Sequence, residues 1–523
     1  MTTEENTKAA AAAPGASPQG GGHGWLPVAV VLVGAFMALL DTTIVTVALP
    51  AIRTGVHASP AALEWVVSAY ALAYGLALVP AGRAGDRSGH KPLFLIGLAV
   101  FTLASAACGL SQNQGELVAA RVVQGIGAGI FYPAIAATIQ LSFTGPRRSK
   151  AFGALGATIG VSIALGPVLG GLIIAGAGPR DGWRWVFGVN LLIGAVALPA
   201  AARLLPRAPS RVRRQFDPAG LLLLSAGLLL LLIPLVEGQQ AGWPAWCYAC
   251  FGGSVAAFAL LAWWEVRSGQ RGKDPLLKPG LLAQSSFSAG AIFAIVYFAG
   301  FTSVFFTISI LWQEGLGRSA LMTGLVAVPF SCGSLVSAAI SDKLSARMGR
   351  MVLVTGCVMA GTGLGLTALA IHLTAPVPGG WYLAGPLLLA GLGNGMVIAP
   401  NQDFALARVP TQEAGTASAI LGTAQRAGSA IGIAVIGTVL FGSLHVRPGP
   451  DATAAFSHSS QLALLANVAF VLVALLLVIG LPRRIPTRCL GAGPVSRNNQ
   501  RYGRGSDRVL DARYDAREAR RSA

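Results

Sequence analysis

The sequence predicts an all-α integral membrane protein with fourteen transmembrane helices. Apolar residues make up 54% of the 523 residues and charged residues 11%, which is less than half the roughly 25% of ordinary soluble domains. Fourteen helices of about 20 residues would use roughly 280 residues, close to the apolar share of the chain. This composition excludes a soluble globular enzyme.

Fourteen apolar runs predict the helices, because about 20 residues span the hydrocarbon core of a bilayer. They cover residues 26–48, 62–81, 92–110, 117–141, 151–175, 186–202, 218–236, 245–264, 286–311, 321–340, 351–371, 382–401, 415–442 and 462–482. The first 24 residues lack the basic start and short apolar core of a signal peptide, so we expect a disordered cytoplasmic tail there.

The basic residues that separate the runs predict the orientation, since Lys and Arg are retained on the cytoplasmic side. With the N-terminus inside, the cytoplasmic segments hold 31 of the 38 basic residues. In chain order these are Lys8; Arg83, Arg87 and Lys91; Arg147, Arg148 and Lys150; Arg203, Arg207, Arg211, Arg213 and Arg214; Arg267, Arg271, Lys273 and Lys278; Lys343, Arg347 and Arg350; Arg408; and eleven Arg from Arg483 to Arg521. The external loops hold five, which are Arg53, Arg180, Arg184, Arg318 and Arg447.

This asymmetry predicts a multi-pass protein of the cell inner (plasma) membrane with both termini in the cytoplasm. It also explains the net charge of +18 without a nucleic-acid partner. The Arg-rich segment after Pro482 is expected to be a solvated arm, with attraction to anionic lipid as the alternative.

Residues that could support enzyme chemistry are sparse. Cys247 and Cys250 form a CxxC pair, but without a second pair or a nearby histidine they indicate core packing rather than a metal or redox site. The sequence has no Gly-x4-Gly-Lys-Ser/Thr phosphate loop, no Gly-x-Ser-x-Gly elbow and no His-Glu-x-x-His pair. We therefore expect no enzyme activity, no metal and no ATP site.

Internal repetition indicates two related halves. The segment Gly82–Lys91 has a weaker copy 260 residues later at Asp342–Arg350, and Gly153 is related to Gly415 by a similar offset. Repeated halves around a midplane site are typical of transporters. The expected domains are a cytoplasmic tail over 1–24, a six-helix bundle over 25–202, two inserted helices over 203–285, a second six-helix bundle over 286–482 and a basic cytoplasmic tail over 483–523.

Several of these segments resemble the major facilitator superfamily. Gly82–Lys91 is similar to the signature between its second and third helices, and Arg121–Gly127 to its fourth-helix signature. The motif of its proton-driven antiporters is matched in the fifth span by Gly153, Gly166, Pro167, Gly170 and Gly171. Leu40–Pro50, with Trp183–Trp185, resembles the fourteen-span drug:proton antiporter branch. His90 and Ala346 depart from the signatures, so we expect only the first loop to be fully functional.

The resemblance implies the major facilitator fold and export of hydrophobic drugs or antibiotics in exchange for protons by alternating access. A proton gradient would be the energy source, with no cofactor. The partners implied are a hydrophobic small-molecule substrate, protons and membrane lipid, and the chain is expected to be a monomer. A proton-coupled uptake symporter on the same fold and a non-transporting membrane sensor remain alternatives.

Ionisable residues within spans are the clearest candidates for a site, because a charge at the bilayer centre costs several kcal/mol unless it is paired. Asp41 lies about 14 Å, and Arg121 about 8 Å, from the outer ends of their spans, so their depths overlap. We expect Asp41 to carry the proton and Arg121 to tune its binding, with a static ion pair as the alternative.

Other polar residues allow more than one role. The possible substrate contacts are Gln124, Gln425 and Arg426, and a static polar contact is nearly as good an interpretation of Arg426. Glu64, Glu237 and Asp403 fall at span ends, where hydrated carboxylates are ordinary.

Two motifs suggest conformational roles. The resemblance implies that Asp86 docks on the span beginning near Gly415 in one transport state, supported by Gly82, Arg87, Gly89 and Lys91. A solvated loop charge is the alternative. For the antiporter motif glycines the resemblance implies a kinked helix and a tight inner seal, whereas close helix packing without a functional role is the alternative.

Overall fold

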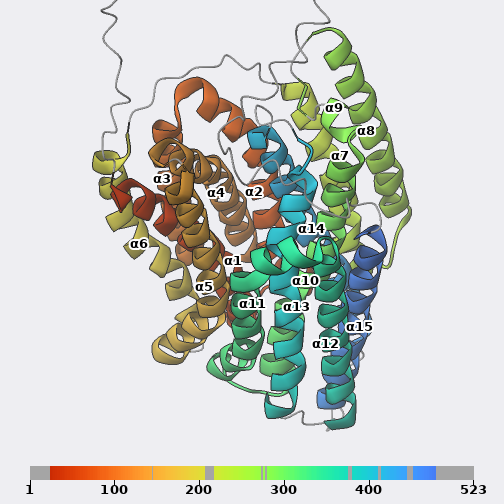
Figure 1. The fold of residues 1–523 in the computed structure, drawn as a ribbon. Coiled ribbons are helices and arrows are strands. Elements are labelled where there is room, and N and C mark those ends of the chain that lie inside the picture. Colours follow the sequence, from red (N-terminus) through yellow and green to blue (C-terminus); the bar gives the residue numbers. More distant parts are fainter. Residues whose placement is uncertain are drawn as a thin grey trace, which may run out of the picture. The chain divides into compact units, whose positions relative to one another are not determined.

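The computed structural model describes residues 24–143, 145–178, 180–206, 217–272, 275–276, 279–374, 380–409, 414–444 and 452–478. These residues form helices joined by short connections, with no strand among them (Figure 1). Fourteen helices are long and apolar enough to cross a membrane. The predicted all-α membrane class and its fourteen spans are confirmed.

The helices follow the predicted order. They are α1 (Trp25–Gly55), α2 (Pro60–Ser88), α3 (His90–Leu110), α4 (Gln114–Ser142), α5 (Gly145–Ala177), α6 (Gly182–Leu204), α7 (Pro218–Ala241), α8 (Ala245–Gln270), the short α9 (Pro279–Leu282), α10 (Ser285–Ile310), the π-helical turn η1 (Leu311–Gly315), α11 (Ala320–Met348), α12 (Met351–Thr374), α13 (Gly380–Leu406), α14 (Ala414–Gly442) and α15 (Ala452–Leu477).

Short polar side chains fix the starts of several helices. The Ser59 hydroxyl accepts a hydrogen bond from the Ala62 amide at the start of α2. The Asn113 side chain accepts one from the Glu116 amide at the start of α4, 3.0 Å away. Each cap satisfies an amide that has no partner within the helix, so the chain enters the apolar run at a defined residue.

The segment after α2 is not the loop that the sequence suggested. α2 continues through Ser88, and α3 begins at His90 after the single residue Gly89, whose φ is 90°. After α11 two residues, Gly349 and Arg350, precede α12, and Gly349 has a φ of 57°. Glycine adopts positive φ without steric cost, which allows such short connections. Both sequence copies therefore end their helix at a glycine with positive φ.

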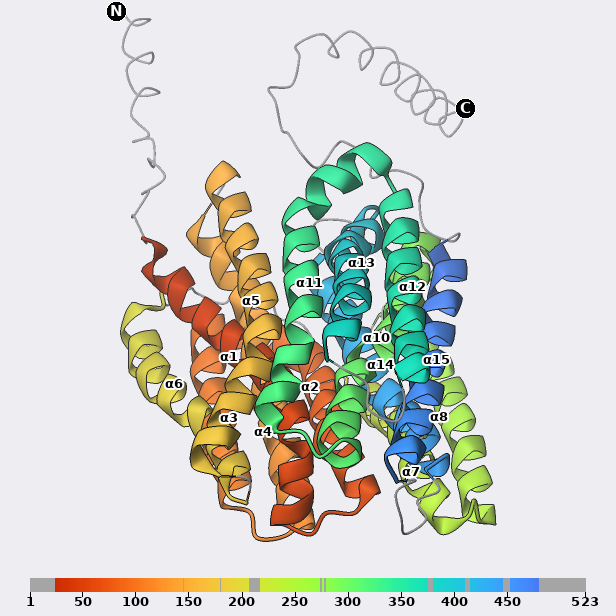
Figure 2. The same ribbon diagram turned by 90° about the horizontal axis from the view of Figure 1, so that it is seen from below.

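Helices far apart in sequence meet along two seams. α2 packs against α14, and α5 packs against α11 (Figures 1 and 2). On one side of these seams α1 contacts α4, α5 and α6, and on the other α10 contacts α13, α14 and α15. α7 packs on α8 and also reaches α2 and α14, so the predicted inserted helices lie beside the α2–α14 seam.

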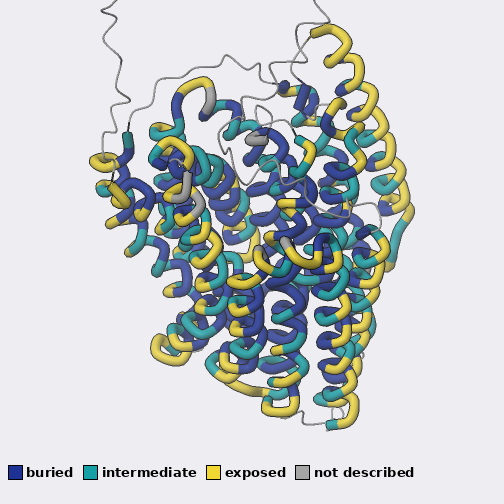
Figure 3. Tube along the Cα trace, in the orientation of Figure 1, coloured by how far each residue is buried: buried dark blue, intermediate teal, exposed yellow. Residues whose placement is uncertain are grey.

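The surface is apolar in a way that suits lipid. Leu110, Leu192, Val196 and Val255 are each more than 70% exposed, and exposed positions run along whole helices such as α8 (Figure 3). Soluble proteins rarely expose so much apolar surface. Helices satisfy their backbone hydrogen bonds internally, which is what spanning a bilayer requires. The chain is a multi-pass membrane protein.

Candidate functional site

Asp41 on α1 and Arg121 on α4 form an ion pair in the interior of the first six helices. Arg121 Nη1 lies 2.5 Å from Asp41 Oδ2, and both side chains have no exposed surface. The sequence placed these two residues at similar depths, and the structure brings them into direct contact.

Amide side chains complete the surroundings of the Asp41 carboxylate. Gln124 Nε2 donates to Asp41 Oδ1 over 2.9 Å, and Asn190 Nδ2 on α6 donates to the same oxygen over 2.8 Å. Both amides also donate to the Ser105 hydroxyl on α3. Each carboxylate oxygen therefore has a donor, and the network links four helices around one acid.

Arg121 is held on a second side by α2. Its Nε donates to the Val66 carbonyl over 2.8 Å, and its guanidinium lies 4.0 Å from the centre of the Tyr70 ring. The Tyr70 hydroxyl donates to the Ala38 carbonyl, which ties this ring to α1. Nη2 of Arg121 is buried and has no hydrogen-bond partner in the described part of the chain. Arg121 therefore has one hydrogen-bond donor group that the described residues do not use.

The residues predicted to contact substrate occupy two places. Gln124 is fully buried within the Asp41 network. Arg426 on α14 lies with its guanidinium 4.3 Å from the centre of the Tyr74 ring, and Tyr74 meets the Tyr132 ring edge to face. Gln425, the neighbour of Arg426, is half-buried. The Arg426 cluster joins α2 and α4 to α14 and so connects the two halves.

The signature between α2 and α3 is anchored by its basic residues. Lys91 Nζ donates to the carbonyls of Ala202 and Leu205 at the end of α6, where a positive charge complements the helix dipole. Arg83 donates to the backbone carbonyls of Pro275 and Leu276. These anchors were not anticipated from the sequence.

The predicted gating residues are only partly described. A Cβ built on Gly82 would lie 3.9 Å from the Pro133 side chain of α4. Arg87 is exposed. The Asp86 side chain, and with it the predicted docking near Gly415, lies outside the described residues.

The antiporter motif places small residues where α5 meets α1 and α11. A Cβ built on Gly166 would overlap the Thr43 side chain, two residues after Asp41, and one on Gly170 would lie 3.0 Å from the Ile44 carbonyl oxygen. Gly171 faces the start of α11, and the Pro167 carbonyl faces Gly324 within it. Gly153 is different, because nothing lies within 4 Å of its Cβ position.

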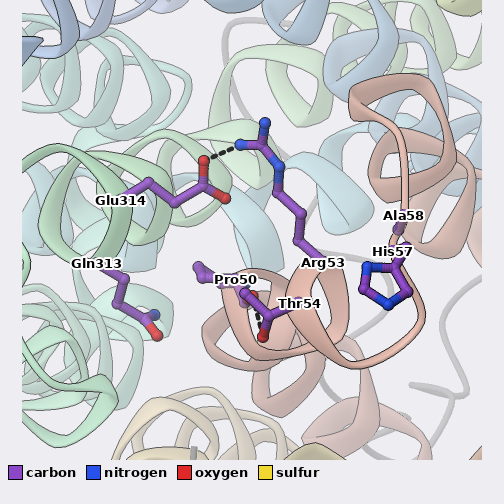
Figure 4. Close-up of a pocket in the computed structure, with 7 residues that line it drawn as sticks. All are labelled: Pro50, Arg53, Thr54, His57, Ala58, Gln313 and Glu314. Carbon is purple, nitrogen blue, oxygen red and sulfur yellow. Dashed lines mark hydrogen bonds and ion pairs between the residues drawn. The ribbon is translucent and has the colours of Figure 1, made fainter. Parts of the chain in front are cut away.

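A second polar contact joins the halves near the end of α1. Arg53 pairs with Glu314 of η1, and Gln313 Nε2 donates to the Val47 carbonyl over 2.8 Å. An open pocket of about 620 Å³ lies beside this pair (Figure 4). Its lining consists of Pro50, Arg53, Thr54, His57, Ala58, Gln313 and Glu314. The pair was not anticipated from the sequence, since Arg53 and Glu314 are 261 positions apart.

One expectation about acidic residues was wrong. Glu64 was interpreted as a hydrated carboxylate at a span end, yet it is only 3% exposed. Packing of α2 against α14 covers it, and a pattern within one helix does not reveal which partner helix will lie there. Among the described residues, no group of three or more His, Cys, Asp or Glu could hold a metal ion.

Sequence comparisons give the family. A model of the Major Facilitator Superfamily matches residues 31–433. The chain is 35% identical over 438 residues to a probable actinorhodin transporter of Streptomyces coelicolor, covering 84% of this chain and 75% of the relative. It is 32% identical to a cephamycin export protein of Amycolatopsis lactamdurans, covering 88% of this chain and 94% of that one. A tetracenomycin C resistance and export protein of Streptomyces glaucescens is 30% identical, over 80% and 76% of the two chains.

Solved structures agree on the fold. A peptide transporter structure superposes with a TM-score of 0.61 at 14% identity, covering 90% of this chain and 98% of that one. A xylose transporter of E. coli superposes with a TM-score of 0.56 at 14% identity, over 84% and 96% of the two chains. The family match, the transporter relatives and the fourteen spans agree: the chain belongs to the major facilitator superfamily and is a membrane transporter, not an enzyme.

Proposed function

We propose that this transporter exports a hydrophobic drug or antibiotic in exchange for protons. Three relatives, named for actinorhodin, cephamycin and tetracenomycin C, support a substrate of this class. The proton gradient supplies the energy, and the two halves expose the site alternately to either side of the membrane.

The observation that carries the proposal is the buried Asp41–Arg121 pair. Asp41 has no exposed surface and lies against a cation and two amide donors. A carboxylate in such a place can bind and release a proton only when water reaches it, which requires a conformational change. Protonation would remove the attraction that holds α1 to α4 through Arg121. Proton binding and helix movement are thereby coupled.

The names of two relatives, which are an export protein for cephamycin and one for tetracenomycin C, support outward transport. The Lys and Arg distribution indicates which end of each helix is external. With both termini in the cytoplasm, the end of α1 that carries Arg53 is external. The Arg53–Glu314 pair and the Gln313–Val47 hydrogen bond join the two halves at that end. This arrangement favours an inward-facing state, in which substrate would enter from the cytoplasm or inner leaflet.

Proteoliposome transport tests the proposal. Vesicles containing the purified protein are given a pH gradient, and uptake of the monocationic dye ethidium and of a neutral anthraquinone dye is followed. Asp41→Asn is expected to abolish gradient-driven uptake. A thermal unfolding measurement is expected to show that the variant is still folded. Asp181→Asn is the matched control, because Asp181 is a solvent-exposed acid whose side chain is 66% exposed. Wild-type exchange rates in Asp41→Asn would remove Asp41 from the coupling mechanism.

A further inference from the structure

We propose that Glu64 is a second proton-binding carboxyl of this transporter, located where α2, α7 and α14 meet. The inference deepens the proposed proton exchange and rests on it for its meaning in transport. The protonation of Glu64 itself can be tested without any transport activity.

The Glu64 carboxyl is enclosed and lacks a compensating partner. The residue is 3% exposed, and its Oε2 is buried without a hydrogen-bond partner among the residues that the structure describes. A Cβ built on Gly437 of α14 would overlap the Glu64 carboxyl group. The absence of a side chain at Gly437 therefore leaves the space that the carboxyl group occupies in the seam. Burying an ionised carboxylate without a partner costs several kcal/mol, and a bound proton removes that cost.

A second acid lies beside this part of α2. Glu237 of α7 accepts a 2.9 Å hydrogen bond from Trp65 Nε1, and Trp65 is the neighbour of Glu64 in the chain. Two carboxylates that share a site resist simultaneous ionisation. From α14, Gly437 offers no side chain, and the Thr438 hydroxyl donates instead to the Leu235 and Ala434 carbonyls.

A proton fits this site better than a larger cation. The backbone of Gly437 closes directly over the carboxyl and leaves no room for a substituted ammonium group. A metal ion would need more oxygen ligands than Glu64 and Glu237 supply. Ser68, one turn further along α2, is a second buried polar group without a hydrogen-bond partner in the described chain. Ala61, Ala71 and Leu72 of α2 pack in one apolar cluster with residues of α7 and α14, so Glu64 lies in a mainly apolar seam.

The position of Glu64 links its proton to the movement of the halves. α2 belongs to the first half and α14 to the second, so Glu64 lies in the seam between them. Release of the proton leaves a carboxylate that needs water, and water reaches it only if the seam opens at this level. Glu237 on α7 gives the inserted helices a part in this step. In this proposal Glu64 binds one proton when water enters the seam from one side of the membrane. It releases that proton when water enters the seam from the other side.

Infrared spectroscopy of the full chain in lipid nanodiscs tests the protonation directly. Difference spectra between acid and alkaline pH are recorded for wild type, Glu64→Gln, Glu237→Gln and Asp41→Asn. We expect a carboxylic acid C=O band that shifts in D₂O, disappears in Glu64→Gln and persists in Glu237→Gln and Asp41→Asn. The matched control is Glu116→Gln, which replaces an exposed acid at the start of α4. The glutamine oxygen replaces one of the two carboxylate oxygens that accept from Gln112 and Asn113, and the amide of residue 116 still donates to the Asn113 side chain. The same band in wild type and Glu64→Gln would overturn the proposal.

Proton counting tests the link to transport. With ethidium in proteoliposomes, the number of protons exchanged per dye is expected to fall by one in Glu64→Gln, while Asp41→Asn abolishes exchange. An unchanged proton number in Glu64→Gln would refute the coupling role. If the wild-type protein exchanges no protons for dye, the proposed function is contradicted. The infrared band would still decide whether Glu64 binds a proton.

Discussion

Gly171→Ala tests the contact between the halves, with Gly153→Ala on the same helix as the matched control. A Cβ at Gly171 would lie 2.6 Å from Leu321 Cα and 2.7 Å from the Ala320 carbonyl oxygen at the start of α11. Restoring ordinary van der Waals contact requires α5 and α11 to part by roughly 1 Å. Both neighbours are backbone atoms, so a side-chain rotation cannot relieve the clash.

Overpacking of this kind costs about 1–3 kcal/mol. Because the clash exists only while α5 and the start of α11 are in contact, the cost shifts the balance between transport states by about 5- to 150-fold. At Gly153, where nothing lies within 4 Å, alanine adds no clash and favours the helix by about 0.5–1 kcal/mol.

The assay is maleimide labelling of Ala58→Cys in a protein whose six native cysteines are replaced. Ala58 lines the pocket beside the Arg53–Glu314 pair and is only 6% exposed, so its labelling reports opening of this face (Figure 4). Gly171→Ala is expected to speed labelling and Gly153→Ala to leave it unchanged. Unaltered labelling in Gly171→Ala, or an equal effect of Gly153→Ala, would refute the assignment of these glycines to different roles.

Three further predictions concern charge. In a double-mutant cycle, Arg53→Ala and Glu314→Ala should each increase Ala58→Cys labelling, with a coupling of about 0.5–1 kcal/mol, since the Arg53 side chain is 38% exposed and is partly screened; additive effects would show that the two residues do not interact. Asp86→Asn should bias cysteine accessibility toward the inward-open state about tenfold, for a contact of about 1.4 kcal/mol, whereas an equal effect of Asp342→Asn would show that the two signature copies do not differ. Cells expressing the chain should resist neutral and monocationic compounds more than dicationic biocides, because one carboxylate at the Asp41 site cannot serve a proton and two positive charges; strong resistance to a dication would contradict this.

The fourteen spans could be predicted because each is a long apolar run that ends at charged, polar, Gly or Pro residues, and lipid imposes an apolar run on every helix separately. Asp41 and Arg121 could be predicted for the same reason, since a charge inside a span is costly enough to require a partner. Their partners could not. Asn190 and Ser105 are short polar residues in otherwise apolar helices, and many such residues bond only to their own backbone.

Contacts between the halves were harder still. The interpretation of Glu64 depended on its place in one helix, whereas its burial depends on Gly437, far away in the chain. The segment around Gly89 was interpreted as a loop because charged residues are typical of connections between spans. Charged residues can also form the ends of helices that project into water. Patterns within a helix predict the helix, and only the packing of helices shows which side chains meet.

The π-helical turn η1 sets the direction in which Glu314 points, and the Arg53–Glu314 contact depends on that direction as well as on charge. The Leu316 amide donates to the Leu311 carbonyl, five residues back, so the turn holds one residue more than an α-helical turn. That extra residue rotates the next part of the chain by about 100° relative to an uninterrupted α-helix. Deleting a single residue from the turn would therefore swing Glu314 away from α1 with both members of the pair still present. The closure of this face depends on the hydrogen-bond register of one helical turn.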